Sequence, residues 1–154
     1  MENYSESERW MRDARDSFIR AQRCFNEKDW KGTIQNAQLT IELSAKAMIA
    51  LFEEPDWTHS PDEQLRGVIG SRRKELENKF ASSFLDEILY TADDAEVAAP
   101  WHGWSAYGKE REDGSGWIPA VDLCPKEVAE DLLRRAKRTI STGEKFLETL
   151  AEKR

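Results

Sequence analysis

Residues 34–48, which read IQNAQLTIELSAKAM, contain the pattern that decides the fold. Apolar residues recur at steps of three and four and therefore share one face of a helix. These positions are Ile34, Ala37, Ile41, Ala45, Met48, Leu51 and Phe52. A row of polar residues, Gln38, Glu42 and Lys46, runs beside that face at steps of four. Glu42 precedes Lys46 in the orientation that stabilises a helix by about 0.2–0.5 kcal/mol, so we interpret this pair as structural.

The same periodicity predicts helices on both sides of this segment. A first helix is expected over residues 7–26, and Asp29 is the expected N-cap of the second helix, which ends before Pro55. Further helices are expected over residues 61–71, 73–97 and 126–152. The predicted class is all-α: an up-and-down helical bundle of four main helices plus a short helix, in a single domain over residues 1–154.

The start of the short helix has a particularly clear signal. Ser60 is the expected N-cap, Pro61 fits the first helical position, and Glu63 would complete a capping box. The region 98–122 is different, because aromatic residues there alternate with glycine and proline. We expect a long loop that covers the core, a partner or a pocket.

Composition limits the function. The chain has 154 residues and a net charge of −7, which argues against a general nucleic-acid binder, because phosphate affinity rests on clustered Lys and Arg. No apolar run is long enough to cross a bilayer, and the first residues lack signal-peptide character, so a cytoplasmic protein without a membrane association is expected. Two cysteines, Cys24 and Cys124, are then expected as reduced thiols.

The A-Q-x-x-x-E-x-x-x-K-A pattern of residues 37–47, the helix before it and His59 in the loop after it resemble the HEPN domain family. Residues 14–30 are similar to that family's first helix and the turn that follows it. The resemblance implies a HEPN-like helical bundle that acts as a nucleotide-binding or protein-interaction domain. It also implies a homodimer, an RNA or nucleotide ligand, and a minimal nucleotidyltransferase as partner in a toxin–antitoxin-type system.

HEPN proteins that cleave RNA carry an Arg, four to six residues, and then a His. Here the His of that region is His102, and residues 95–98 contain no Arg. The family's Arg-Tyr pair corresponds to Ala106-Tyr107, again without the Arg. These departures favour a non-enzymatic role. The alternative is a metal-independent RNase toxin in which His102 moves the proton, Tyr107 lies beside it, and Arg111 (or Arg72 or Arg73) binds the phosphate.

Other candidate residues have two interpretations each. His59 and Arg66 could bind a nucleotide phosphate at the start of the third helix, where backbone N–H groups favour anions. Alternatively, His59 packs beside Trp57 and bonds Ser60. His102 could instead be held between two tryptophans of the loop. The residues expected at a protein–protein interface are Trp101, Trp104 and Trp117.

A metal site is the last alternative. It would combine Cys24, Cys124, His59 and His102, but their spacings match no ligand motif. The sequence therefore predicts no metal and no cofactor.

Overall fold

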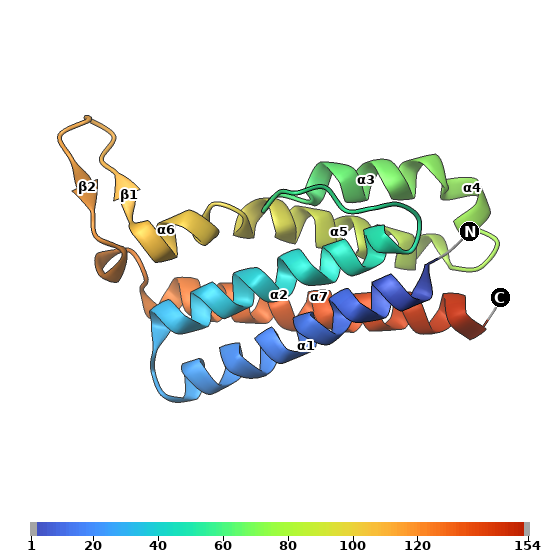
Figure 1. Ribbon diagram of the computed structural model, residues 1–154, viewed down its shortest axis with the longest axis horizontal. Helices are drawn as coiled ribbons and strands as arrows, with labels where there is room; N and C mark the ends of the chain where they lie inside the picture. Colours follow the sequence, from blue (N-terminus) through green and yellow to red (C-terminus); the bar gives the residue numbers. More distant parts are fainter. Residues whose placement is uncertain (1–2, 153–154) are drawn as a thin grey trace.

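The computed structural model describes residues 3–152, and it is an all-α bundle with one small hairpin (Figure 1), so the predicted class is confirmed. Residues 1–2 and 153–154 of the expected domain lie outside the described part. The elements in chain order are α1 (Tyr4–Asn26), α2 (Trp30–Ala50), α3 (Asp62–Ser71), α4 (Arg73–Leu76), α5 (Ser82–Ala98), α6 (Trp101–Tyr107), β1 (Lys109–Glu110), β2 (Trp117–Ile118), the 3-10 turn η1 (Ala120–Asp122) and α7 (Lys126–Glu152).

Helix α2 lies at the centre of this arrangement. It contacts α1, α3, α5, α6 and α7, and both ends of the chain lie at the same end of the bundle (Figure 1). Because helices surround it, α2 is buried along nearly its whole length from Thr33 to Ala50. The predicted apolar face is therefore inside, but the polar row beside that face is buried as well. Asp29 is the N-cap, as predicted, and its Oδ1 accepts a hydrogen bond from the Gly32 N–H at 2.8 Å.

The core consists of two clusters of buried side chains. One lies around Met11, Met48, Leu85 and Phe146, and joins α1, α2, α5 and α7. The other lies around Ile34, Ile41 and Leu132, toward the end of the bundle that carries the hairpin. Burial of large apolar side chains at these positions supplies the main favourable free energy of folding.

The helix expected over residues 73–97 is interrupted, so that prediction was wrong in its extent. Helix α4 ends at Leu76, and α5 begins at Ser82 after an extended Ala81. The four-residue steps Leu76, Phe80 and Phe84 suggested one continuous stripe. All three side chains are buried, but Phe80 reaches the core from the turn, where it stacks on Phe84. Tertiary packing therefore overrides the local pattern here.

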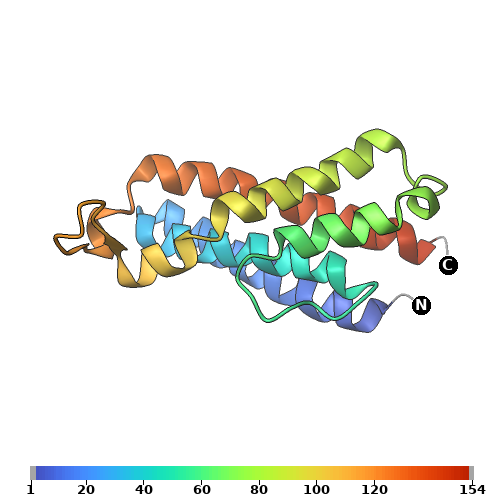
Figure 2. The ribbon, with the colours of Figure 1, turned by 90° about the horizontal axis from the view of Figure 1, so that it is seen from above.

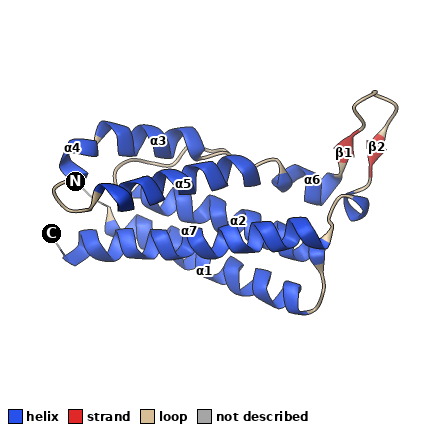
Figure 3. Ribbon diagram, turned by 180° about the vertical axis from the view of Figure 1, so that it is seen from behind, coloured by secondary structure: helices blue, strands red, loops and turns tan. Residues whose placement is uncertain are grey.

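The region 98–122 is not a simple loop, which corrects the second expectation. It contains α6, the β1–β2 hairpin and η1, and α6 follows α5 after a bend at residues 99–100 (Figure 2). The two short strands pair Lys109 with Ile118 and Glu110 with Trp117 (Figure 3). Gly108 enters the hairpin with φ +89°, and a Cβ there would lie 2.2 Å from the carbonyl oxygen of Ile118.

The start of α3 also differs from the prediction. Pro61, not Ser60, is the N-cap, and no side chain caps this end. The Ser60 N–H instead bonds Thr58 Oγ1 at 3.1 Å. The loop of residues 51–61 runs back along the bundle before α3 begins (Figure 1), and this path determines what His59 contacts.

Candidate functional site

The buried polar row of α2 forms a hydrogen-bonded chain. Gln38 Nε2 donates to Glu42 Oε1 at 3.1 Å, and Lys46 Nζ donates to Glu42 Oε2 at 3.3 Å. The side chains of Lys46 and Glu42 are only 8% and 6% exposed, so this structural ion pair is buried inside the bundle. Each carboxylate oxygen of Glu42 has a partner, as burial of a charge requires.

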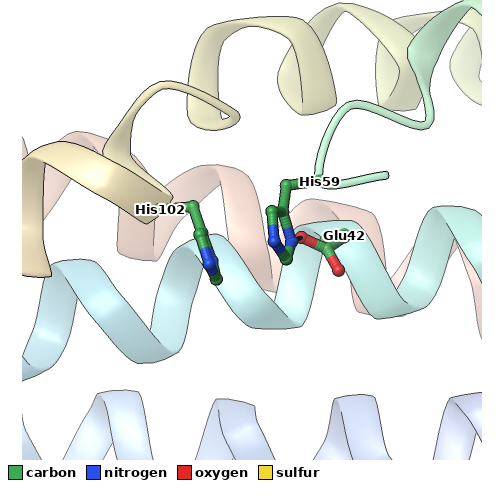
Figure 4. Close-up of side chains that lie close together, drawn as sticks. All are labelled: Glu42, His59 and His102. Carbon is green, nitrogen blue, oxygen red and sulfur yellow. Dashed lines mark hydrogen bonds and ion pairs between the residues drawn. The ribbon is translucent and has the colours of Figure 1, made fainter. Parts of the chain in front are cut away.

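Two histidines lie on this row (Figure 4). His59 Nδ1 lies 3.0 Å from Glu42 Oε1, and His102 Nδ1 lies 3.4 Å from Gln38 Oε1. The two rings stack on each other, with centroids 3.5 Å apart and planes inclined by 17°. Because a carboxylate only accepts, His59 Nδ1 carries the hydrogen of its contact with Glu42. We call Gln38, Glu42, Lys46, His59 and His102 the histidine cluster.

Three separate elements position this cluster. Glu42 and Gln38 are fixed on α2, His59 comes from the returning loop, and His102 comes from the first turn of α6. A hydrogen bond from Gln35 Nε2 to the Ser105 carbonyl oxygen, at 3.1 Å, holds α6 against α2. Trp57 is fully exposed, so the expected packing of His59 beside it was wrong, and His59 contacts Glu42 and His102 instead. His102 lies against His59 rather than between two tryptophans.

A cavity of about 360 Å³ adjoins the cluster between α2 and α6. We call it the α2–α6 groove. Its lining comes from Gln35, Asn36, Gln38, Leu39, His102, Ser105, Ala106 and Tyr107. Residues with amide, imidazole and phenol side chains therefore line one space of a size that suits a small ligand.

A model of the HEPN domain family matches residues 7–120 of the chain. The chain belongs to the HEPN domain family. This membership makes it a nucleotide- or RNA-related protein of the HEPN superfamily. No curated protein and no solved structure matches the chain. Within residues 3–152, no helix combines the length and the apolar character that crossing a membrane requires.

The residues compared above with the family's nuclease motif, 95–98 and His102, lie at the end of α5 and in the first turn of α6. Residues 95–98 are in the last turn of α5, where Ala95 and Ala98 are buried and Glu96 bonds Arg66. Arg111 lies beyond β1, and its backbone N–H bonds the Gly116 carbonyl oxygen within the hairpin. Tyr107 lines the α2–α6 groove together with His102, and the residue is 81% exposed. The structure thus brings His102 and Tyr107 together but places Arg111 in the projecting hairpin.

Arg66 has three acidic partners. It contacts Asp62 at 3.0 Å, Asp93 at 2.8 Å and Glu96 at 3.4 Å. The hydrogen bond with Asp93 raises the pKa of Arg66 above its ordinary value. Asp62 and Glu63 also occupy the first turn of α3. The Arg66 guanidinium is therefore already paired with carboxylates of the chain itself. The negative charge of these carboxylates disfavours binding of an anion at the start of α3.

The three tryptophans of the expected interface differ in exposure. Trp101 is partly buried against the core and meets Trp104 edge to face, with centroids 5.2 Å apart. Trp104 lines a second cavity, of about 440 Å³, with Tyr107 and Trp117. Trp117 is on β2 and is 61% exposed. Together Trp104, Tyr107 and Trp117 form what we call the aromatic surface.

The cysteines are not part of the histidine cluster. Within the described residues, the group whose donor atoms could share a metal ion consists of Glu42, His59 and His102. Burial, with a contribution from Asp29, raises the pKa of the Cys24 thiol. Burial also raises the pKa of Cys124. Both groups are therefore poorer ligands than an ordinary thiol, because the thiolate is the form that binds metals.

Sequence reasoning missed Gln38 and Glu42 as site residues. A signal for them existed, since polar side chains at steps of four beside an apolar face need partners when the helix is buried all round. Two histidines from other segments are among these partners: His59 contacts Glu42, and His102 contacts Gln38.

Proposed function

We propose that this HEPN chain is a nucleotide-binding domain that holds its ligand in the α2–α6 groove. The observation that carries the proposal is the placement of His102, Tyr107 and three amide side chains around one cavity of about 360 Å³. Asn and Gln amides can read the edge of a base, an exposed aromatic ring can stack on it, and an imidazole can donate to a phosphate. The carboxylates around Arg66 favour this groove over the start of α3 as the ligand site. His59 does not line the groove but stacks on His102, which does.

Loss of the His102 imidazole should weaken nucleotide binding. A hydrogen bond to a charged phosphate contributes about 1.5–3 kcal/mol, so His102→Ala should raise Kd by about 10- to 100-fold. Calorimetric titration with ribonucleoside monophosphates and triphosphates, in buffer containing EDTA, measures this change. Tyr107→Ala should also weaken binding. Tyr90→Ala is the matched control, because Tyr90 is 56% exposed on α5 outside the groove. Equal nucleotide affinity in His102→Ala, Tyr107→Ala and Tyr90→Ala, or no binding by the wild type, would refute the proposal that the nucleotide binds in the α2–α6 groove.

We further propose that two copies pair through the aromatic surface. The hairpin projects from the end of the bundle (Figure 1), and Trp117 on its second strand is largely exposed. Trp and Tyr are enriched at the centres of protein interfaces. A minimal nucleotidyltransferase is the second partner in this proposal, within a toxin–antitoxin-type pair.

The dimer can be tested by removal of one ring. Trp117→Ala should raise the dimer dissociation constant by about 30-fold, the effect of losing about 2 kcal/mol from an interface anchor. Analytical ultracentrifugation over a concentration series measures it. Trp57→Ala provides the control, since Trp57 is fully exposed in the loop of residues 51–61. A wild-type chain that stays monomeric, or an equal loss with Trp57→Ala, contradicts this interface.

The RNase alternative is favoured by one observation. His59 and His102 stack at 3.5 Å, and two neighbouring imidazoles can give and take a proton. The place of Arg111 in the hairpin and the acidic partners of Arg66 count against it, because the phosphate would need a guanidinium beside the two histidines. Under this alternative, expression arrests growth, purified protein cleaves RNA without metal, and His102→Ala removes both effects. Growth arrest and RNA cleavage that persist in His102→Ala would eliminate it.

A further inference from the structure

We propose that Glu42, His59 and His102 bind a divalent transition-metal ion of the Zn²⁺ or Co²⁺ type. One donor atom from each residue lies within 4.8 Å of the others. The three residues come from α2, the loop of residues 51–61 and α6, and in Figure 4 the His59 ring lies between the His102 ring and the Glu42 carboxylate. This site stands independently of the nucleotide proposal, because it requires only the three side chains.

The donor set determines the kind of ion. Two imidazole nitrogens and one carboxylate oxygen form a set that zinc uses when one coordination position stays open to water or a ligand. Imidazole suits Zn²⁺, Co²⁺ and Ni²⁺, whereas Mg²⁺ and Ca²⁺ prefer oxygen ligands. The open position would lie beside the α2–α6 groove, since His102 lines both.

The surroundings of the three ligands support the assignment. Glu42 is buried, and its Oε2 accepts from Lys46 while its Oε1 faces Gln38 and His59. The ion would therefore bind at Oε1, on the side away from the ammonium group. Gln38 also lies against His102 Nδ1. Such outer contacts orient metal ligands in proteins, and their loss weakens affinity.

Binding requires a small rearrangement of His59. The rings are nearly parallel, so their lone pairs do not meet at one point. Ligand atoms that lie about 2.0–2.1 Å from a tetrahedral ion are about 3.4 Å from one another. The donor atoms of the three residues now lie within 4.8 Å of one another, so the most distant pair would have to move closer together. His59 is the ring that can turn, because it is on a loop and its side chain is 58% exposed. The ion would replace the proton between His59 Nδ1 and Glu42 Oε1, which lie 3.0 Å apart.

The test uses the full chain without a histidine tag and without nucleotide. The chain has only two histidines, and both belong to this site. CoCl₂ titration followed by visible absorption, with ZnCl₂ calorimetry, should give one ion per chain. The Cys24→Ser/Cys124→Ser variant should bind equally, with no thiolate charge-transfer band. His59→Ala and His102→Ala should each raise Kd by about tenfold or more. Glu63→Gln is the control, because Glu63 is an exposed acid at the start of α3.

The outcomes separate clearly. Absence of Co²⁺ and Zn²⁺ binding, binding unchanged in both histidine variants, or binding lost in the cysteine variant would each overturn the proposal. The histidine variants keep the test valid if Glu42→Gln unfolds, since both imidazoles are partly exposed. A negative result leaves nucleotide binding unaffected, because that titration is performed in EDTA.

Discussion

Replacement of Lys46 by methionine is expected to lower the free energy of unfolding by about 3–5 kcal/mol. The ammonium group is buried with Glu42 at 3.3 Å, and it lies 5.5 Å from the centre of the Trp10 ring. Methionine keeps most of the volume but leaves the Glu42 carboxylate without its cation in the interior of the bundle. Urea unfolding followed by circular dichroism measures the change.

An exposed pair of the same spacing gives the control. Lys126 contacts Glu130 at 3.7 Å, and both side chains are more than half exposed. Lys126→Met should therefore change stability by less than about 1 kcal/mol. The double variant Glu42→Gln/Lys46→Met should recover a large part of the loss, because no uncompensated charge remains. Equal effects of Lys46→Met and Lys126→Met would show that the buried pair does not support the bundle.

Phe146→Ala is expected to have an effect of similar size, about 3–5 kcal/mol. Phe146 on α7 is fully buried, and its ring lies 6.2 Å from that of Phe52 and 5.2 Å from that of Phe80. Alanine would leave a cavity where α7 meets the end of α2 and the turn between α4 and α5. The same urea experiment measures the loss.

The comparison for Phe146 is an aromatic residue on the surface. Tyr90 is 56% exposed on α5, so Tyr90→Ala should cost far less than Phe146→Ala. A loss below about 1 kcal/mol for Phe146→Ala would mean that the core closes around the missing ring, or that α7 does not pack as described.

The main helices could be predicted because each presents one apolar face to the core. The pattern of residues 34–48 placed α2 correctly, and Asp29 marked its start. The break before Ser82 could not be predicted, since Phe80 keeps the four-residue step although it lies in a turn. Helix α6 was missed because glycine and proline in residues 98–122 favour a loop locally, whereas packing against α2 stabilises the helix.

The candidate site was predictable only in its parts. His59, His102 and Tyr107 were identified separately, and Glu42 was interpreted only as half of a structural ion pair with Lys46. The side chains of Glu42, His59 and His102 come into contact only because residues 51–61 run back along the bundle and because α6 packs against α2. Neither follows from local periodicity, because both are set by contacts between residues far apart in the chain. Arg66 was misleading for a related reason, since its acidic partners come from α3 and α5.

The most direct test of the central proposal is a nucleotide titration followed by amide and histidine-ring chemical shifts in NMR spectra. The chain has two histidines, so the ring signals of His59 and His102 can be assigned by single substitutions. Binding in the α2–α6 groove predicts the largest shifts at residues 35–39, at residues 102–107 and in the His102 ring. Shifts confined to the start of α3 or to α7, or no shifts at all, would contradict it.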